Sequence, residues 1–284
     1  MKIKFSKMHG AGNDFVMLDG VTQALELRAE DIRFLADRHL GVGADQVLLV
    51  SGSENPNVDF RYRIFNQDGS EVEQCGNGAR CFVKFVRHCG LTDKTKIRVQ
   101  TMKTVIEPEL LADGRVRVNM GAPIFDPQQL PFSPQALPTR MLGQAQQWQL
   151  NHADGDLWFS ALSMGNPTAT IFVNNVTDTP VDRWGQFVGE HSVFPNRTNV
   201  AFLEILDKNN ARIRVFERGA GETLACGSGT CAAIVAAMKT GLCQDFVEVQ
   251  AKGGNLRIEW DGLEKSPVYL IGPAEHVFDG ELEI

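Results

Sequence analysis

Two cysteines are the residues best suited to carry out chemistry in this sequence, because both stand in the pattern Cys-Gly-x-Gly. Cys75 opens the segment CGNGARC, and Cys226 opens the segment CGSGTC in the second half of the chain. The reactive form of cysteine is the thiolate, and a helix N-terminus lowers a thiol pKa and binds anions through its unpaired N–H groups. If a helix begins at each glycine pair, the pattern predicts two reactive thiols, each beside a site of carboxylate size.

The two cysteine motifs belong to an internal repeat. Residues 61–90 and 212–241 align without a gap at a constant offset of 151, and eight of the thirty positions are identical. Ordinary composition gives about two identities by chance. The identical pairs are Arg61/Arg212, Arg63/Arg214, Phe65/Phe216, Glu71/Glu222, Cys75/Cys226, Gly76/Gly227, Gly78/Gly229 and Gly90/Gly241. The repeat predicts two copies of one unit, each with an alternating strand, a loop and a helix that follows the cysteine.

Two thiols at equivalent positions of a repeat are suited to two-base proton transfer. One thiolate removes the hydrogen from a carbon, and the other thiol returns a proton to the opposite face, which inverts the centre. Oriented N–H groups stabilise the charge that builds up on a substrate carboxylate. A single cysteine before a glycine-rich helix start is usually a small buried residue, so only the matched pair favours chemistry. The remaining cysteines have no counterpart in the repeat, and we expect them to fill the core or the surface: Cys81, Cys89, Cys231 and Cys243.

Several polar residues also occupy matching places in the two halves of the chain. These pairs are Asn13/Asn166, Gln46/Asn199 and Asn66/Glu217. A lone loop asparagine is normally a turn former, but such pairs around a cleft are typical of ligand donors and acceptors. Glu217 and Arg218 are adjacent and could hold an ammonium and a carboxylate, the two charged groups of an amino acid.

The length of 284 residues is enough for two domains, in agreement with a repeat whose copies lie about half a chain apart. Five prolines punctuate residues 121–149, where we place the domain boundary. We therefore expect a first domain over residues 1–123, to which 272–284 returns, and a second domain over 124–271.

Local patterns predict several of the elements in these domains. The spacing of apolar residues favours a short helix over 29–39, and strands over 96–100 and 115–120. The segment AAIVAAM at 232–238 is apolar on all sides and predicts a helix buried within its domain.

Composition and charge exclude other classes of protein. The formal charge is −7, the pI is about 5.4, and no basic block stands out, so we expect no nucleic-acid or membrane partner. The longest apolar run, 231–238, is far shorter than the ~18 residues of a membrane span. The N-terminal MKIKFSKMHG lacks the apolar region of a signal peptide, so six cysteines indicate free thiols in a reducing cytoplasm.

A metal site and a dinucleotide site are the rival interpretations of the glycine and cysteine motifs. The spacings C-x5-C-x7-C and C-x4-C-x11-C differ from zinc motifs, and the six histidines form no H-x3-H pattern, so we expect no metal. The segment GSGTCA at 227–232 fits the fingerprint G-x-G-x-x-A. However, nine residues separate the strand at 212–217 from the first glycine, whereas a Rossmann turn is tighter. A dinucleotide-dependent dehydrogenase is therefore the weaker alternative.

Longer segments of the chain resemble the diaminopimelate epimerase family over nearly the whole length. They are KMHGAGNDFV at 7–16, GVGADQ at 41–46, FNQDGSEVEQCGNGARC at 65–81, MGNP at 164–167, RTNVAF at 197–202, ERGAGETLACGSGT at 217–230 and GPAEHVFDGE at 272–281. The resemblance implies an α/β (α+β) fold of two pseudo-symmetric repeat domains, each a curved, mostly antiparallel sheet around a central helix. It also implies an active site in the cleft between the domains.

The activity that the resemblance implies is cofactor-independent epimerisation of LL-2,6-diaminopimelate to meso-diaminopimelate, in lysine and peptidoglycan biosynthesis. A related amino-acid racemase of the proline racemase type is the alternative. The family is typically a homodimer, so the expected partners are a small amino-acid substrate and a second copy of the chain.

The resemblance also implies roles for individual residues. Cys75 would be the proton donor and Cys226 the acceptor in one direction, with Glu217 beside them. The carboxylate at the reacting centre would be held by Gly76, Asn77, Gly227 and Ser228. The ammonium of that centre would meet Asn66 and Glu217. The remaining residues would hold the substrate mostly at its distal end: Asn13, Gln46, Asn166, Asn199 and Arg218.

Two positions depart from the family pattern. Many members have a histidine after the Asn-Pro of MGNP, where it is thought to tune the cysteines, and this chain has Thr168. A hydroxyl cannot carry the charge of an imidazolium, so tuning would depend more on the helix ends and on Glu217. Some members have tyrosine near the dimer contact at Phe278, which keeps the apolar ring but lacks the hydroxyl.

Overall fold

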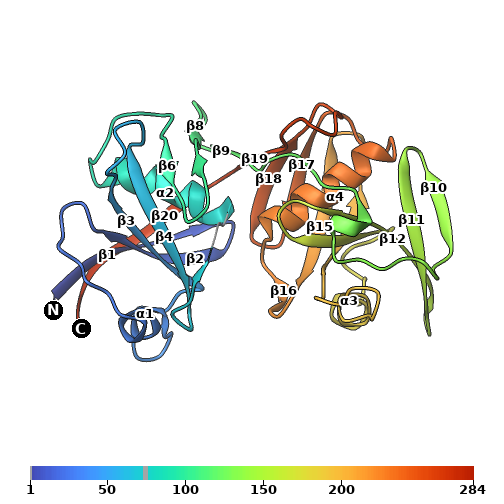
Figure 1. Cartoon of the computed structure of the whole chain (residues 1–284), viewed down its shortest axis with the longest axis horizontal. Coiled ribbons are helices and arrows are strands. Elements are labelled where there is room, and N and C mark those ends of the chain that lie inside the picture. Colours follow the sequence, from blue (N-terminus) through green and yellow to red (C-terminus); the bar gives the residue numbers. More distant parts are fainter. Residues whose placement is uncertain (1, 73–75) are drawn as a thin grey trace. The chain divides into compact units, whose positions relative to one another are not determined.

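The structure is a computed structural model, and it describes residues 2–72 and 76–284 (Figure 1). The chain divides into two compact units, Met1–Asn119 with Ile271–Ile284, and Met120–Leu270. The boundary expected from the sequence lies at residues 123 and 124, within the proline-rich segment. Among the described residues, no helix is long and apolar enough to cross a membrane.

The first unit contains a sheet with the strand order β20-β1-β2-β3-β4-β6-β7, and β5 pairs with β4. Its strands are β1 (Lys2–Gly10), β2 (Asn13–Asp19), β3 (Gln46–Gly52), β4 (Phe60–Asn66), β5 (Glu71–Val72), β6 (Val99–Gln100), β7 (Val105–Ile106) and β20 (Glu275–Glu283). The first unit also contains a hairpin of β8 (Glu109–Leu110) and β9 (Val116–Asn119), which is not part of this sheet. The helices are α1 (Ala29–Ala36) and α2 (Gly76–His88). The C-terminal strand β20 pairs antiparallel with β1 and so returns to the first unit.

The second unit contains strands in the order β10-β11-β12-β13-β14-β15-β17-β18, and β16 pairs with β15. They are β10 (Thr139–Leu142), β11 (Ala145–His152), β12 (Gly155–Ser163), β13 (Pro167–Phe172), β14 (Asn199–Ile205), β15 (Asn210–Glu217), β16 (Gly221–Thr223), β17 (Phe246–Ala251) and β18 (Gly254–Glu259). The helices are α3 (Val181–Gly189) and α4 (Gly227–Lys239), with a 3-10 turn η1 (Pro127–Gln129). The strand β19 (Tyr269–Gly272) then leads back along the chain to β20.

The two units repeat one topology. The order β1-β2-β3-β4-β6-β7 in the first unit has its counterpart in β12-β13-β14-β15-β17-β18. The parallel pairs also correspond, since β2–β3 and β4–β6 match β13–β14 and β15–β17, while the other pairs are antiparallel. Parallel neighbours need a crossover, and in each unit helices occupy both crossovers. The prediction of two alike, mostly antiparallel sheet domains with a central helix is confirmed.

Alternation along β2 gives the sheet of the first unit two covered faces. Val16 and Leu18 join a core cluster with Ile32 of α1. Phe15 is buried too, and its ring stands 3.4 Å from where a side chain at Gly78 of α2 would begin. Because successive strand residues point to opposite faces, α1 covers one face and α2 the other.

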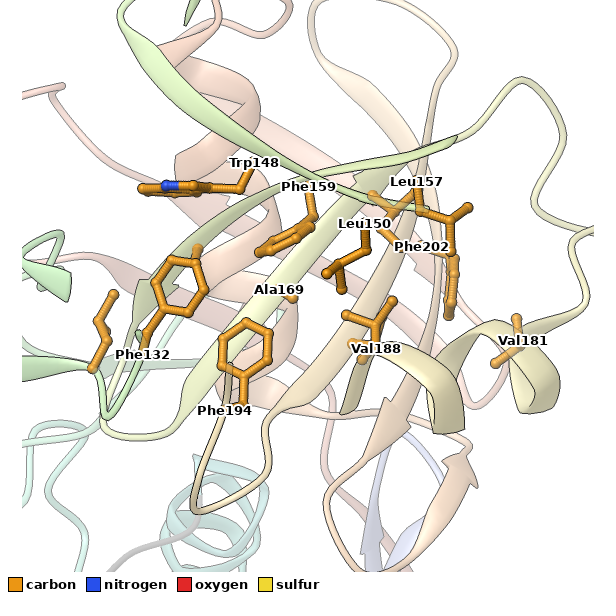
Figure 2. Close-up of a cluster of buried hydrophobic side chains, with 14 of the residues drawn as sticks. Phe132, Trp148, Leu150, Leu157, Phe159, Ala169, Val181, Val188, Phe194 and Phe202 are labelled. Atoms are coloured by element: carbon orange, nitrogen blue, oxygen red, sulfur yellow. The ribbon is translucent and has the colours of Figure 1, made fainter. Parts of the chain in front are cut away.

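Aromatic rings dominate a core cluster of the second unit, shown in Figure 2. The ring of Phe132 stacks on Phe194 with centroids 4.7 Å apart, and it meets Trp148 edge-on at 4.9 Å. Val188 of α3 and Phe202 of β14 belong to the same cluster, so α3 packs on the sheet through it. Burial of several aromatic side chains is the largest apolar contribution to this core.

The long helices α2 and α4 have equal lengths and end in the same way. Each has 13 residues, and each is followed by a glycine with positive φ, 69° at Gly90 and 77° at Gly241. The next residue donates back into the last turn, from Leu91 to Val86 and from Leu242 to Ala237. Glycine suits this left-handed position, which explains why the repeat keeps it. Residues 232–237 of α4 are all buried, as their apolar character predicted.

Three elements are shorter than predicted. The helix expected over 29–39 ends at Ala36, because Asp37 Oδ1 accepts hydrogen bonds from the N–H groups of His39 and Leu40 at 2.7 and 2.8 Å. Such side-chain turns compete with the helix for backbone donors. The strands expected over 96–100 and 115–120 are reduced to β6 and β9, since their flanking residues form loop contacts instead.

Candidate active site in two half-sites

Strand ends bring the candidate residues of the first unit to one edge of its sheet. Asn13 begins β2, Gln46 begins β3 and Asn66 ends β4. Because β2 and β3 are parallel and β4 is antiparallel to β3, two starts and one end share this edge. Gln46 and Asn66 are direct partners in the register. The topology therefore gathers residues that are far apart in sequence.

Hydrogen bonds join four of the predicted residues of the first unit into two pairs. Asn77 Nδ2 donates to Asn13 Oδ1 at 3.0 Å, which places the first turn of α2 beside the start of β2. Gln46 Nε2 donates to Asn66 Oδ1 at 3.1 Å. Gly76 is buried as the first residue of α2. These polar groups form the first half-site, with Asn77 only 4% exposed.

Arg80 supports this half-site and was not predicted. Its side chain is 0% exposed, and its guanidinium donates to Asn77 Oδ1 at 2.9 Å and to the Pro273 carbonyl at 3.0 Å. A side chain at Gly10 would begin 3.1 Å from Arg80 Nη2, so that glycine makes room for it. A buried guanidinium needs such hydrogen bonds. The available signal was a charged residue among apolar neighbours in α2, since Ala79 precedes Arg80 and Cys81, Phe82 and Val83 follow it.

A second unpredicted network lies behind Asn13. Asn13 Nδ2 donates to Asp45 Oδ2 at 3.0 Å, and Arg38 bridges Asp45 and Asp14 with hydrogen bonds of 2.8 Å. Lys7 Nζ also donates to Asp14 at 2.6 Å. Burial opposes ionisation of Asp14, but the hydrogen bonds from Arg38 and Lys7 outweigh it and hold the pKa of that carboxyl well below its usual range. The network fixes the loop from which Asn13 projects.

Cys75, the predicted catalytic residue of the first repeat, lies outside the described residues. Its predicted role therefore stays a prediction. The helix that follows it, α2, begins at Gly76, which is the start that the cysteine motif predicted.

In the second unit, Cys226 is the N-cap of α4. Its backbone is extended, with φ −113° and ψ 108°, and its carbonyl accepts from the N–H of Thr230 at 2.9 Å. The nearby backbone N–H of Gly229 favours the thiolate and so acts to lower the pKa of Cys226. A side chain at Gly229 would begin 3.2 Å from Cys226 Sγ and equally close to Val215. The second glycine of the motif thus lets the thiol lie against the first turn of the helix.

The expected low pKa of Cys226 is wrong for this structure. The thiol is 6% exposed, and burial, followed by the charge and hydrogen bond of Glu217, raises its pKa well above the usual value. The hydrogen bonds from Gly229 and Ser228 act in the opposite direction but are weaker. The helix N-terminus therefore does not overcome desolvation, and the pKa of Cys226 lies above that of an ordinary thiol.

Glu217 and Ser228 flank this thiol from different elements. Glu217 ends β15, and its Oε1 accepts a hydrogen bond from Thr223 Oγ1 at 2.5 Å. Ser228 Oγ stands 3.8 Å from Cys226 Sγ, and Gly227 between the two is buried. The structure thus brings these four predicted residues together at the N-terminus of α4.

Asn199 links the start of β14 to the loop before the thiol. It is 5% exposed, and its Oδ1 accepts a hydrogen bond from the backbone N–H of Arg218 at 2.9 Å. The Arg218 side chain is exposed and donates to the Asn196 carbonyl at 3.3 Å. Thr168 lies opposite Asn199 in the parallel register and is 1% exposed, whereas Asn166 lies in an exposed turn. Thr168 Oγ1 donates to the Asn166 carbonyl at 3.4 Å, but among the described residues the Asn166 side chain has no hydrogen bond to Asn199 or Arg218.

Two ion pairs at matching repeat positions join a central strand to a short strand in each unit. Arg63 Nη2 lies 2.7 Å from Glu71 in the first unit, and Arg214 Nη2 lies 2.8 Å from Glu222 in the second. Each pair ties the central strand to the short strand that precedes the cysteine motif. Arg214 also donates to the Val176 carbonyl at 3.0 Å. These identities of the repeat are thus structural and serve the loop that carries the thiol.

Comparison with known families and proteins gives one consistent result. The family model described as diaminopimelate epimerase matches residues 5–125 and 160–277. The chain is 54% identical over 284 residues to the diaminopimelate epimerase of Ralstonia nicotianae, covering 100% of this chain and 97% of the relative. It is 52% identical to that of Cupriavidus pinatubonensis, covering 100% of this chain and 98% of the relative.

Solved structures with much lower identity share the fold. A phenazine biosynthesis protein of the PhzF family from Bacillus anthracis has a TM-score of 0.71 at 18% identity, covering 100% of both chains. A hydroxyproline epimerase from Agrobacterium vitis has a TM-score of 0.67 at 14% identity, covering 99% of this chain and 91% of that one. At such identity the likeness concerns the fold alone.

Proposed function

Because this chain belongs to the diaminopimelate epimerase family, we propose that it converts LL-2,6-diaminopimelate to meso-diaminopimelate, in lysine and peptidoglycan biosynthesis. The observation that carries this proposal is the environment of Cys226. Its thiol lies at the N-terminus of α4, 3.8 Å from Ser228 Oγ, and its pKa responds to the charge of Glu217. A thiol placed in this way can exchange a proton with a carbon whose carboxylate binds the same helix end.

The reaction moves one proton off the substrate Cα and one proton onto its opposite face. One cysteine, as thiolate, takes the hydrogen as a proton and leaves the electron pair on the carbon, delocalised into the carboxylate. The other cysteine, as thiol, donates its proton to that carbon. Cys75 would be the donor and Cys226 the acceptor in one direction, and the roles reverse in the other.

The charge of Glu217 suggests how Cys226 becomes a base. In the free protein this carboxylate raises the pKa of the thiol. A substrate ammonium bound to Glu217 would neutralise that charge and lower the pKa of Cys226 again. The substrate would thus help to generate the thiolate that deprotonates it. This supports a second role for Glu217, the control of the Cys226 pKa, in addition to substrate binding.

The other candidate residues would hold the substrate. The substrate α-carboxylate would be bound by Gly76, Asn77, Gly227 and Ser228. The α-ammonium would be bound by Asn66 as well as by Glu217. The distal end of the substrate would meet Asn13, Gln46, Asn166, Asn199 and Arg218. The exposed guanidinium of Arg218 supports this assignment, because a distal carboxylate needs a cation that can still move toward it.

We also propose that the reaction needs no cofactor and takes place in the cytoplasm. We propose further that the enzyme is a homodimer. The exposed edge strand β20 supports a dimer, because it carries Val277 and Phe278 with exposed fractions of 53% and 46%. An apolar edge strand is commonly covered by another chain.

Incubation of the purified protein with LL-diaminopimelate in deuterated water tests the proposal. Without any added nucleotide, we expect meso product with deuterium at the inverted Cα, detected by NMR and chiral chromatography. Cys226→Ser should lose inversion, because a hydroxyl is a far weaker acid and base than a thiol. No turnover without NAD would favour the dehydrogenase, and comparable turnover of proline or lysine would favour a general racemase.

A further inference from the structure

Three side chains that commonly bind metals meet at the far end of α2 from Gly76. His88 is the last residue of α2, whereas His276 and Asp279 belong to β20. His88 Nε2 lies 3.1 Å from Asp279 Oδ2, and His276 Nε2 lies 2.8 Å from Asp279 Oδ1. One ligand atom from each residue lies within 4.8 Å of the others. The sheet therefore unites groups that stand 191 positions apart in the chain.

The spacing of these atoms is close to that of a metal site. A tetrahedral ion at about 2.0 to 2.1 Å from each ligand separates neighbouring ligand atoms by about 3.4 Å. The two nitrogen–oxygen distances, 3.1 Å and 2.8 Å, end on different oxygens of Asp279, and each is shorter than this spacing. All pairs of ligand atoms lie within 4.8 Å. The imidazole rings lie nearly face to face, with centroids 4.2 Å apart and planes inclined by 31°. Small side-chain rotations are enough to bring both Nε2 atoms and one carboxylate oxygen around an ion.

The surroundings of the cluster favour binding from solution. The side chains of His88, His276 and Asp279 are 43%, 31% and 53% exposed in the single chain. Asp279 points to the opposite face of β20 from its neighbour Phe278, so its carboxylate does not share the face of the proposed dimer contact. Ser6 Oγ donates to Asp279 Oδ1 at 2.6 Å and orients the carboxylate, as outer hydrogen bonds do in metal sites. Ser6, His88 and Asp279 also line a cavity of about 450 Å³, which leaves room for water on the ion.

We propose that His88, His276 and Asp279 bind one divalent cation of the Zn²⁺ or Co²⁺ type, with water completing its coordination. Two imidazoles and one carboxylate suit such borderline ions, whereas Mg²⁺ and Ca²⁺ prefer oxygen ligands alone. On binding, each neutral imidazole carries its proton on Nδ1 and gives its Nε2 lone pair to the ion. The cation thereby replaces the two hydrogen bonds that now end on Asp279.

Titration of the full-length, chelator-treated protein with Co²⁺ tests this site. We expect one ion per chain with saturable binding in the micromolar range, visible as cobalt absorption bands without the ultraviolet band of a cobalt–thiolate bond. The midpoint of thermal unfolding should rise when Co²⁺ is added, because the ion binds only the folded arrangement. A thiolate band, or no saturation below millimolar Co²⁺, would overturn the proposal.

Matched variants locate the ion. His88→Ala, His276→Ala and Asp279→Asn should each weaken binding by about tenfold or more, and Ser6→Ala by about tenfold. His39→Ala removes another exposed histidine of the same unit and should leave binding unchanged. Because circular dichroism reports whether each variant is folded, undiminished affinity in folded His88→Ala and His276→Ala would refute the site.

Discussion

At the scale of single residues, the state of Cys226 depends on burial and on one neighbouring charge. A helix N-terminus lowers a thiol pKa, but the effect of about half a charge is smaller than the cost of placing a thiolate in a dry site. Glu217 adds a negative charge and accepts the thiol hydrogen bond. Burial and, after it, the charge of Glu217 both raise the pKa of Cys226 in the protein without substrate.

Glu217→Gln should lower the pKa of Cys226, because it removes the negative charge that stabilises the protonated thiol. The pH dependence of Cys226 alkylation, followed by peptide mass spectrometry, measures this shift. The rate of epimerisation should fall at least about 100-fold, because the variant lacks the carboxylate that binds the substrate ammonium and acts on the Cys226 thiol. Glu190→Gln changes an exposed carboxylate of the same unit and is the control. An alkylation profile that is the same in Glu217→Gln and the parent would contradict this account.

At the scale of elements, the start of α4 holds the thiol in place. Gly229 leaves the space that the sulfur occupies, because a side chain there would begin 3.2 Å from Cys226 Sγ. The ion pair of Arg214 and Glu222 ties β15 to β16, and so it fixes both ends of the loop that precedes Cys226. Positioning here comes from paired elements and not from the cysteine motif alone.

Gly229→Ala should impair activity more than stability. The new methyl group would begin 3.2 Å from Cys226 Sγ, so the thiol must move by a few tenths of an ångström. We expect turnover to fall by about tenfold, because proton transfer is sensitive to such displacement. The unfolding midpoint should stay nearly constant, since alanine favours the helix by about 1 kcal/mol and offsets the contact. Circular dichroism and turnover measure the two effects.

Gly52→Ala is the matched control for this variant. No atom lies within 4 Å of its Cβ position, so we expect both properties to be unchanged. Full activity in Gly229→Ala would show that the thiol does not need this position.

At the scale of the whole molecule, two features bear on stability and on the proposed dimer: the buried carboxylate of Asp14 and the edge strand β20. The carboxylate of Asp14 is 17% exposed and pairs with Lys7 and Arg38. At the sheet edge, Phe278 packs edge-on against Phe5 with centroids 6.0 Å apart, yet nearly half of its side chain remains exposed.

The parent protein should lose stability in acid partly through Asp14. Its folded pKa is lower than its unfolded pKa of about 3.9, so its contribution is full above pH 4 and disappears as the pH falls toward the folded pKa. Asp14→Asn should therefore lower stability by about 2 to 3 kcal/mol at pH 7, and the difference should vanish in strong acid.

Urea unfolding between pH 7 and pH 2 measures this difference. Asp113→Asn, which changes an exposed carboxylate with a lowered pKa, is the control and should have little effect. A constant difference between Asp14→Asn and the parent across this range would disprove the role of Asp14.

Phe278→Lys should convert the proposed dimer into a monomer, because it places a charge on the apolar edge of each copy. Sedimentation equilibrium at micromolar protein measures the mass. Leu263→Lys, at a side chain 64% exposed in the second unit, is the control and should keep the parent's mass. A parent protein that is already monomeric at this concentration would contradict the dimer.

The sequence by itself determined the repeat, the class of fold and the places where α2 and α4 begin. These features are local, because alternation, helix starts and left-handed glycines such as Gly90 and Gly241 act over a few residues. The motif that contains Cys226 and its partners in the loop could be found in the same way. The resemblance of the whole chain to a known family then added further candidate substrate-binding residues, such as Asn199.

Only the tertiary structure decided which groups are buried and which charges meet. Burial in the folded chain raises the pKa of Cys226. Folding also places Arg80 within hydrogen-bond distance of Asn77, and His88 next to Asp279 of β20. Desolvation and Coulomb interactions depend on distances between atoms from distant parts of the chain, and no sequence period encodes those distances.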